Sequence, residues 1–285
     1  MVPEKIFLKK VMVLLSQDGY EQDFVAFGEK LKKEDIVFQY IGIDDKVMEN
    51  DWCQGLLVIT DHGNSARELQ DSGIAVLAFL HEHNREQSFG GVLYAMENPA
   101  DLDVEYLENV YRRHHRIPWD ILETKRCLIR ETCVTDVEAF YEIYKEPSIT
   151  EYMEDLFQDI EEERQYVRDY IDKVYGFYGF GVWTIIEKES GAIIGRAGLS
   201  YREGFDDAEL GFVIGVLWQG KGYAYEVCSA IMEYGKTELE LPVIQAFVEI
   251  GNDKSVRLCK KLGMQNAEEV EIKGIKYWCM KRSSL

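Results

Sequence analysis

The sequence predicts an α/β (α+β) protein of two domains, a small parallel α/β domain over residues 1–123 and a mixed-sheet domain over residues 124–285. In the first part, apolar segments of strand length alternate with segments of helical periodicity, which is typical of a parallel sheet covered by helices. Pro118 interrupts this alternation, and a second complete series of strands and helices follows it. The 285 residues suit two domains, since a domain averages about 150 residues.

Composition and charge disfavour several classes of function. The apolar fraction of 46% is ordinary for a globular protein, so a full core can form. The formal net charge of −20 argues against binding to nucleic acid or to an anionic membrane surface, because both require a basic face. The same charge favours cationic partners such as amines, although an acidic surface often serves solubility alone.

Cysteine usage and the lack of long apolar runs indicate a cytoplasmic protein. The first ten residues lack the apolar core of a signal peptide, and no apolar run approaches the ~20 residues of a membrane-spanning helix. There is no Cys-x-x-Cys pair, and several cysteines lie in apolar segments, so reduced and buried thiols are expected. The six cysteines are Cys53, Cys127, Cys133, Cys228, Cys259 and Cys279.

The first domain is expected to alternate between strands and helices. Residues 9–15 form a short apolar segment that fits either a strand or a helix. Gly73 closes one of the helical segments, as glycine often does just beyond a helix. The other predicted strands cover residues 36–43, 55–60, 74–80 and 91–96, and the predicted helices cover residues 20–33, 64–71 and 103–115.

Two stretches of this domain resemble the core half of the haloacid-dehalogenase-like fold. They read VITDHGNSARELQDSGIAVLAF at residues 58–79 and GVLYAMENPADLD at residues 91–103. Phosphatases of that kind need a nucleophilic Asp with a second Asp two residues later. Asp61 is followed two residues later by Gly63, and no matching Lys is evident. We therefore expect the domain to be non-catalytic.

Two histidine pairs are candidate functional groups, but a structural role is favoured for each. His81 and His83 flank Glu82 after a predicted strand, and alternate strand residues point the same way. Two imidazoles without a clear third ligand make a weak metal site, so a polar loop is favoured and no metal is expected. His114 and His115 end a predicted helix, where positive groups complement the helix dipole and capping is the favoured role.

The second domain is expected to contain a further series of strands and helices. Thr135 and Asp136 can cap its first helix, which carries Tyr144 on its apolar face and is broken by Pro147. Gly191 marks a hairpin between two strands. Besides the central motif, the predicted strands cover residues 126–131, 181–187, 193–200, 243–250 and 276–281, and the predicted helices cover residues 160–175 and 255–262, the latter followed by Gly263.

An apolar strand that leads into an amphipathic helix is the centre of the second domain. Residues 210–217 are apolar and include β-branched side chains, which suits a strand. After a glycine-rich turn, apolar residues recur with helical spacing at Ala224, Val227, Cys228, Ile231 and Met232.

The turn between them has the features of an anion site. Gly220 and Gly222 have no Cβ, so the backbone can approach a ligand and adopt positive φ. The first amides of the following helix lack partners within it and carry the positive end of its dipole. A diphosphate is the predicted ligand, and Lys221 adds a positive charge near it.

The turn, Gln-Gly-Lys-Gly-Tyr-Ala, matches the Gln/Arg-x-x-Gly-x-Gly/Ala pattern of the GNAT N-acetyltransferases, and the stretch GNDKSVRLCKKLGM at residues 251–264 is similar to a second element of that family. The opening LIRETCVTDVEAFYEIYKEPSITEYM also resembles the family's first strand and helices. The branch of ribosomal-protein N-terminal acetyltransferases is the most similar. The resemblance implies direct transfer of an acetyl group from acetyl-CoA to the amine of a small molecule or a protein N-terminus, in a ternary complex.

The resemblance also implies the residues of the site. Glu209, at the start of the central strand, is the first candidate for the general base, and Glu249 on the adjacent strand is the second. A solvated or paired carboxylate is the alternative for each, and for Glu249 it is favoured. The residues expected to bind acetyl-CoA are Phe212, Val213, Ile214, Gln219, Gly220, Lys221, Gly222, Tyr223, Ala224, Asn252 and Ser255.

Several points stay open at the level of the sequence. Asn252 can also serve as a helix N-cap before Ser255. Relatives often have Tyr where this chain has Cys259, so the general acid is undefined, and Tyr225, a water or departure of CoA as a thiolate are the alternatives. A non-catalytic acyl-CoA sensor is the competing function. The acceptor and the oligomeric state, including a homodimer, are not specified.

Overall fold

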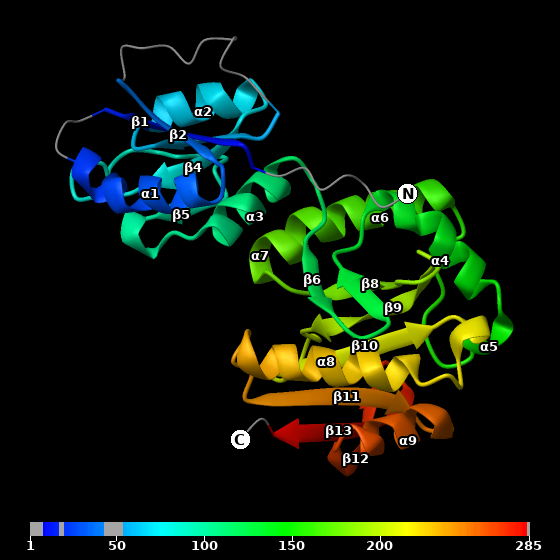
Figure 1. The fold of residues 1–285 in the computed structure, drawn as a ribbon. Helices are drawn as coiled ribbons and strands as arrows, with labels where there is room; N and C mark the ends of the chain where they lie inside the picture. The colour runs from blue at the N-terminus through cyan, green and yellow to red at the C-terminus, as the bar shows by residue number, and fades with distance from the viewer. Residues whose placement is uncertain (1–7, 17–19, 43–53, 284–285) are drawn as a thin grey trace. The chain divides into compact units, whose positions relative to one another are not determined.

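The computed structural model describes residues 8–16, 20–42 and 54–283, and these form two compact units, Val2–Trp119 and Asp120–Leu285 (Figure 1). The predicted fold class is confirmed, because one unit contains a parallel sheet and the other a mixed sheet. The domain boundary predicted after residue 123 stays a prediction about independent folding. The strand Asp120–Glu123 nevertheless pairs within the sheet of the second unit.

The sheet of the first unit has five parallel strands in the order β2-β1-β3-β4-β5. The segment that fitted either a strand or a helix is a strand, because its apolar side chains are buried between layers on both faces. The strands are β1 (Lys10–Leu15), β2 (Val37–Gly42), β3 (Leu56–Thr60), β4 (Ala75–Phe79) and β5 (Ala95–Met96).

Helices cover both faces of this sheet. The helices are α1 (Val25–Lys33), α2 (Gly63–Asp71) and α3 (Val104–His114). Leu31 of α1 and Leu107 of α3 belong to one core, and Ala66 and Leu69 of α2 belong to another on the opposite face (Figure 1). Two apolar faces on the sheet explain why its central strands read as continuous apolar runs rather than as alternating ones.

The second unit is built on an eight-stranded sheet in the order β12-β13-β11-β10-β9-β8-β7-β6. All neighbouring strands are antiparallel except β10 and β11. The strands are β6 (Asp120–Glu123), β7 (Cys127–Arg130), β8 (Val182–Glu187), β9 (Ile193–Ser200), β10 (Ala208–Ile214), β11 (Val243–Glu249), β12 (Gln265–Ile272) and β13 (Ile275–Ser283).

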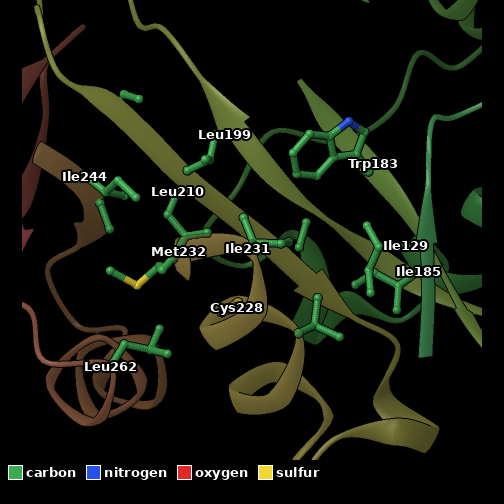
Figure 2. Close-up of a cluster of buried hydrophobic side chains, with 14 of the residues drawn as sticks. Ile129, Trp183, Ile185, Leu199, Leu210, Cys228, Ile231, Met232, Ile244 and Leu262 are labelled. Carbon is green, nitrogen blue, oxygen red and sulfur yellow. The ribbon is translucent and has the colours of Figure 1, made fainter. Parts of the chain in front are cut away.

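One face of this sheet is covered by α8 (Tyr223–Thr237) and α9 (Asp253–Lys261), and the main core lies there. Figure 2 shows Cys228, Ile231 and Met232 of α8 directed toward Leu199 and Leu210 of the sheet. The predicted helical spacing therefore marks the buried stripe of α8. Ile121 and Leu122 of β6 pack against the same core.

The opposite face of the sheet is covered by α4 (Val137–Tyr144), α5 (Pro147–Thr150) and α6 (Ile160–Tyr170). Tyr144 and Ile149 pack there on Val213 of β10. Pro147 ends the first helix as predicted, but it also begins α5, since proline suits the first turn of a helix. The single helix predicted for residues 160–175 is wrong in detail, because α6 passes into a π-helical turn, Ile171–Tyr175, before α7 (Gly176–Tyr178).

Two other predicted elements differ from the structure, and one strand of the structure was not predicted. The central strand ends at Ile214, and a 3₁₀ turn at Val216–Trp218 follows, with Leu217 82% exposed. Apolar character alone could not distinguish a strand from this exposed turn. The strand predicted at residues 91–96 is confined to Ala95–Met96. β12 was not predicted, because its polar edge sequence QNAEEVEI carries little strand signal.

Candidate functional site

The central feature of the second unit is an opening between β10 and β11. The two strands are paired only at Ala208 with Ile244 and at Glu209 with Gln245. Beyond these pairs β10 stays bound to β9 as far as Ile214, while β11 follows β13 to its end. The strands therefore part on the carboxyl side of Glu209. Backbone polar groups along the inner edge of β10 are left without a strand partner there.

The direction of the peptide groups of β10 follows from its last hydrogen bond to β9. The N–H of Gly215 donates to the carbonyl of Ile194 at 2.8 Å. Since successive peptide groups of a strand point to opposite sides, those of Phe212 and Ile214 point toward the opening. The carbonyl of Ile214 accepts a hydrogen bond from the Nε2 of Gln219 at 2.9 Å. Gln219 thus ties the turn to the end of the strand, while the Phe212 amide faces the space between the strands.

The glycine-rich turn leads directly into α8. Gly220 and Gly222 have φ of 72° and 85°, a region that favours glycine. Gly222 is the N-cap residue of α8, and no side chain caps that end of the helix. The first amides of this 15-residue helix therefore carry a positive partial charge at the turn. This geometry suits a phosphate group, as the sequence predicts for residues 219–224.

Arg126 contacts both the glycine-rich turn and the first turn of α8, and the sequence alone did not reveal this role. Its guanidinium carbon lies 3.9 Å from the centre of the Tyr223 ring, and its Nη1 donates to the carbonyl of Lys221 at 3.0 Å. Its Nε and main-chain N–H donate to Glu226, at 2.7 and 2.8 Å, and the Thr124 hydroxyl donates to the same carboxylate at 2.7 Å. Glu226 is 100 residues away in sequence, so only the fold brings this pair together.

Glu226 remains ionised in this arrangement. Burial acts to raise the pKa of its carboxyl, but the hydrogen bonds from Thr124 and Arg126 outweigh burial, and the pKa lies below its usual value. The negative charge of Glu226 in the first turn of α8 is thus neutralised by Arg126. The pair therefore adds no net charge at the turn, where the Nη1 of Arg126 binds the carbonyl of Lys221.

The two candidate bases lie on the face of the sheet opposite α8. Glu209 is 8% exposed and pairs with Arg202, whose Nε and Nη2 donate to its two oxygens. The pair fixes the position of the carboxylate. Glu249 ends β11 and is paired in register with Tyr277 of β13. It shares a sheet face with Gln245, the register partner of Glu209, because residues four apart in a strand point the same way.

The remaining predicted residues have clear structural roles. The Oδ1 of Asn252 accepts a hydrogen bond from the main-chain N–H of Ser255 at 3.2 Å, so Asn252 is the N-cap of α9. Cys259 is buried, and burial raises the pKa of its thiol to about 11. Tyr225 is partly exposed at the start of α8, with the Lys261 ammonium 4.1 Å from its ring centre.

In the first unit, Asp61 is the centre of a small group of buried polar contacts. The main-chain N–H and hydroxyl of Ser16 donate to the two oxygens of Asp61, at 2.6 and 2.9 Å, and the Nε2 of His81 lies 3.3 Å from the same carboxylate. His81 is buried and His83 is exposed, and their ring centres lie 6.0 Å apart. Within residues 8–16, 20–42 and 54–283, no three His, Cys, Asp or Glu side chains are grouped as metal ligands. Cys53 lies outside those ranges.

Comparisons with known proteins identify the second unit. The model of the acetyltransferase (GNAT) domain matches residues 126–265. The uncharacterized N-acetyltransferase p20 of Bacillus licheniformis is 30% identical over 151 residues, which cover 51% of this chain and 83% of that protein. The uncharacterized N-acetyltransferase YnaD of Bacillus subtilis (strain 168) is 31% identical over 145 residues, covering 50% of this chain and 82% of that protein.

The solved structures support the same fold. A ribosomal-protein-S5-alanine acetyltransferase from Vibrio fischeri superposes with a TM-score of 0.50 and 16% identity, covering 57% of this chain and 96% of that one. At this identity the likeness concerns the fold alone. Among the helices that the structure describes, none has both the length and the apolar character needed to cross a membrane.

Proposed function

The chain belongs to the GNAT family of acetyltransferases and is an acyltransferase, and on that premise we propose that it transfers an acetyl group from acetyl-CoA directly to an amine. The observation that carries this proposal is the opening between β10 and β11, which ends at the glycine-rich first turn of α8. It combines an unpaired strand edge with a helix N-terminus in one continuous stretch of chain.

The strand edge and the turn suit two different parts of acetyl-CoA. Residues 219–224 offer the amides of the first turn of α8, together with the charge of Lys221, to the diphosphate. Phe212, Val213 and Ile214 line the inner edge of β10, where an extended pantetheine arm can bind as an additional strand does. Asn252 and Ser255 lie at the start of α9, beyond the end of β11. Their role toward the cosubstrate is a proposal.

The chemistry requires a neutral amine. The base accepts a proton from the ammonium group, and the nitrogen lone pair then attacks the thioester carbonyl carbon. A C–N bond forms, the C–S bond breaks, and its electron pair stays on sulfur. The nitrogen loses its second proton as the amide forms, either to the departing sulfur or to solvent. An N–H at Phe212, directed into the opening, can stabilise the negative charge that develops on the carbonyl oxygen. Glu209 is the proposed base, with Glu249 as the second candidate.

The departing sulfur needs a proton or leaves as a thiolate. Cys259 occupies the position where relatives often have Tyr, but it is buried and its raised pKa keeps the thiol protonated. We therefore assign it to the core rather than to catalysis. Tyr225, partly exposed in the first turn of α8, and a water molecule are the remaining candidates for the acid.

The test is turnover with a panel of amines. The panel contains polyamines, amino acids and short peptides with a free N-terminus, and CoA release is followed with a thiol reagent. Binding of acetyl-CoA is measured separately by calorimetry. Binding together with CoA release that depends on one of these amines supports the proposal. Absence of acetyl-CoA binding, or binding without turnover of any amine, contradicts it and favours the acyl-CoA sensor. The cytoplasmic location also stays a prediction.

A further inference from the structure

The sheet face opposite α8 contains an open space at its centre. Glu209, Gly211 and Val213 of β10 point to this face, because Val213 packs there on Tyr144 and Ile149. A Cβ built on Gly211 would meet no atom within 4 Å. The middle of the central strand is therefore uncovered on this side, next to the opening between β10 and β11.

The neighbouring strand bounds this space. Gly198 of β9 is the register partner of Gly211, and a Cβ on it would lie 2.0 Å from the carbonyl oxygen of Gly181. The start of β8 thus closes the space on that side. Arg196 is the register partner of Val213 and lies on the same face, with its guanidinium carbon 4.7 Å from the centre of the Phe140 ring of α4.

Arg196 is the unusual residue of this face. Its Nε is buried and has no hydrogen-bond acceptor among the described residues. Across residues 8–16, 20–42 and 54–283, no carboxylate forms an ion pair with it. Its guanidinium also acts electrostatically on the hydroxyls of Tyr144, Tyr166 and Tyr170, and the buried carboxylate of Glu163 acts on Tyr144 and Tyr166 without forming an ion pair with Arg196.

A half-buried guanidinium whose Nε is shielded from solvent and unpaired is costly unless an anion compensates it. The ring face of Phe140 provides part of that compensation, since cations are attracted to aromatic faces. The N–H groups of arginine point outward in the plane of the guanidinium, however, where a ring stacked on its face cannot accept a hydrogen bond. The Nε–H therefore still lacks an acceptor, and the free-energy cost of removing it from water is not offset. A carboxylate is the natural complement, because its two oxygens match two neighbouring N–H groups of arginine.

We propose that the amine acceptor carries a carboxylate, which Arg196 binds while the amine lies over Gly211 beside the opening between the strands. This inference rests on the proposed acetyl transfer and names the class of its acceptor. Gly211 lies two residues before Val213, the register partner of Arg196, which is about 7 Å along the strand at about 3.3 Å per residue. That length suits an amino acid or another small amino acid-like acceptor. A polyamine would place a cation against Arg196 and is disfavoured.

The test compares acceptors that differ only in the acid group. Phenylalanine is compared with phenethylamine and methionine with 3-(methylthio)propylamine, and γ-aminobutyrate and spermidine are added as further acceptors. In the wild-type protein, kcat/KM is expected to favour the acid of each pair by about tenfold to a hundredfold, as a hydrogen bond to a charged group allows. Arg196→Gln is expected to bring this ratio close to one while leaving acetyl-CoA affinity unchanged.

Arg164→Gln is the matched control. Arg164 lies on α6, and its guanidinium pairs with Glu138 and Glu161, so this substitution should leave the preference intact. If Arg196→Gln does not fold, inhibition of the wild-type protein decides: 3-phenylpropionate should compete with phenylalanine, and phenylpropanol should not. Equal rates within each pair, or no competition by the acid, overturn the inference but not the acetyltransferase. Failure to bind acetyl-CoA overturns both.

Discussion

Arg202 holds both carboxylate oxygens of Glu209, with its Nε at 2.6 Å and its Nη2 at 2.9 Å. This hydrogen bonding is the main cause that raises the pKa of the arginine above its usual value. Arg202 also lies over the ring of Phe247 in β11, with its guanidinium carbon 5.4 Å from the ring centre. The pair therefore spans β10, the loop before it and β11, and it fixes the proposed base at the mouth of the opening.

Glu209→Gln tests that base directly. The variant keeps the shape of the side chain but cannot take a proton, so acetylation at pH 7 should fall by roughly a hundredfold to ten-thousandfold while acetyl-CoA affinity changes little. The loss should shrink at higher pH, where more free amine exists. Rates across the pH range are the measurement, and Glu142→Gln, at an exposed carboxylate of α4 that pairs with Lys145, is the control. A Glu209→Gln variant with wild-type rates throughout would make Glu209 structural and Glu249 the next residue to change.

Gly222→Asp tests the anion site at the first turn of α8. It adds a negative charge and a Cβ at φ 85°, where a Cβ would lie 3.6 Å from the Nη2 of Arg126. Gly222→Ala adds the Cβ alone, so the difference between the two variants isolates the charge. Calorimetry should show a loss of acetyl-CoA affinity well beyond that of Gly222→Ala. Equal affinity of the two folded variants would place the diphosphate elsewhere.

Asp136 provides a test of stability that is independent of the reaction. It is buried and accepts hydrogen bonds from Arg130 at 2.6 and 2.7 Å and from the hydroxyl of Thr184 at 2.8 Å. Asp136→Asn leaves the Arg130 guanidinium buried without its carboxylate. Unfolding in urea at pH 7 should show a loss of about 3–5 kcal/mol. A loss below 1 kcal/mol would mean that water readily replaces the pair.

The pH dependence of this contribution has a definite sign. Burial acts to raise the pKa of Asp136, but the hydrogen bonds and charge of Arg130 outweigh it, so the folded-state pKa lies below the ordinary value of 3.8. The stabilisation is therefore complete well above pH 3.8 and is lost as the pH falls past that value through the folded pKa. The difference in stability between wild type and Asp136→Asn should shrink over the same acidic range.

A fragment beginning at Asp120 should fold on its own and bind acetyl-CoA. β6 pairs with β7, and the Nζ of Lys188 lies 2.7 Å from the Glu123 carboxylate. A second fragment beginning at Thr124 lacks this edge strand and should be less stable in thermal unfolding. Failure of both fragments to fold would show that the first unit is needed for the stability of the second. A soluble fragment that cannot bind acetyl-CoA would place part of the site outside it.

The first unit is expected to lack phosphatase activity. Asp61 is fully buried, and both of its oxygens accept hydrogen bonds from Ser16, so the carboxylate is not free to act as a nucleophile. Magnesium-dependent hydrolysis of a general phosphate ester should not exceed the buffer rate. Hydrolysis that disappears in Asp61→Asn would reverse this expectation and support the haloacid-dehalogenase-like resemblance, which stays untested.

The central motif was predictable from local sequence patterns. The contacts of the site that were not predicted join residues whose proximity depends on the tertiary fold. Gly220 and Gly222, followed by apolar residues at helical spacing, predicted the turn and α8 because that information lies within one short stretch. Arg126 reaches Glu226 across 100 residues, so no local pattern could reveal the support behind the turn. The pairing of Glu209 with Arg202 depends on the loop before β10, whose path is set by tertiary contacts rather than by periodicity.

The buried thiols of the second unit allow the local opening of α8 and α9 to be measured. Cys228 of α8 and Cys259 of α9 are both fully buried, and burial raises the pKa of each thiol. Because the thiolate is the reactive form, an alkylating reagent can modify these residues only when the helices transiently separate from the sheet. The alkylation rate therefore reports the free energy of local opening around α8. A cosubstrate bound at the first turn of α8 would be detected as slower labelling of Cys228, without any catalytic assay.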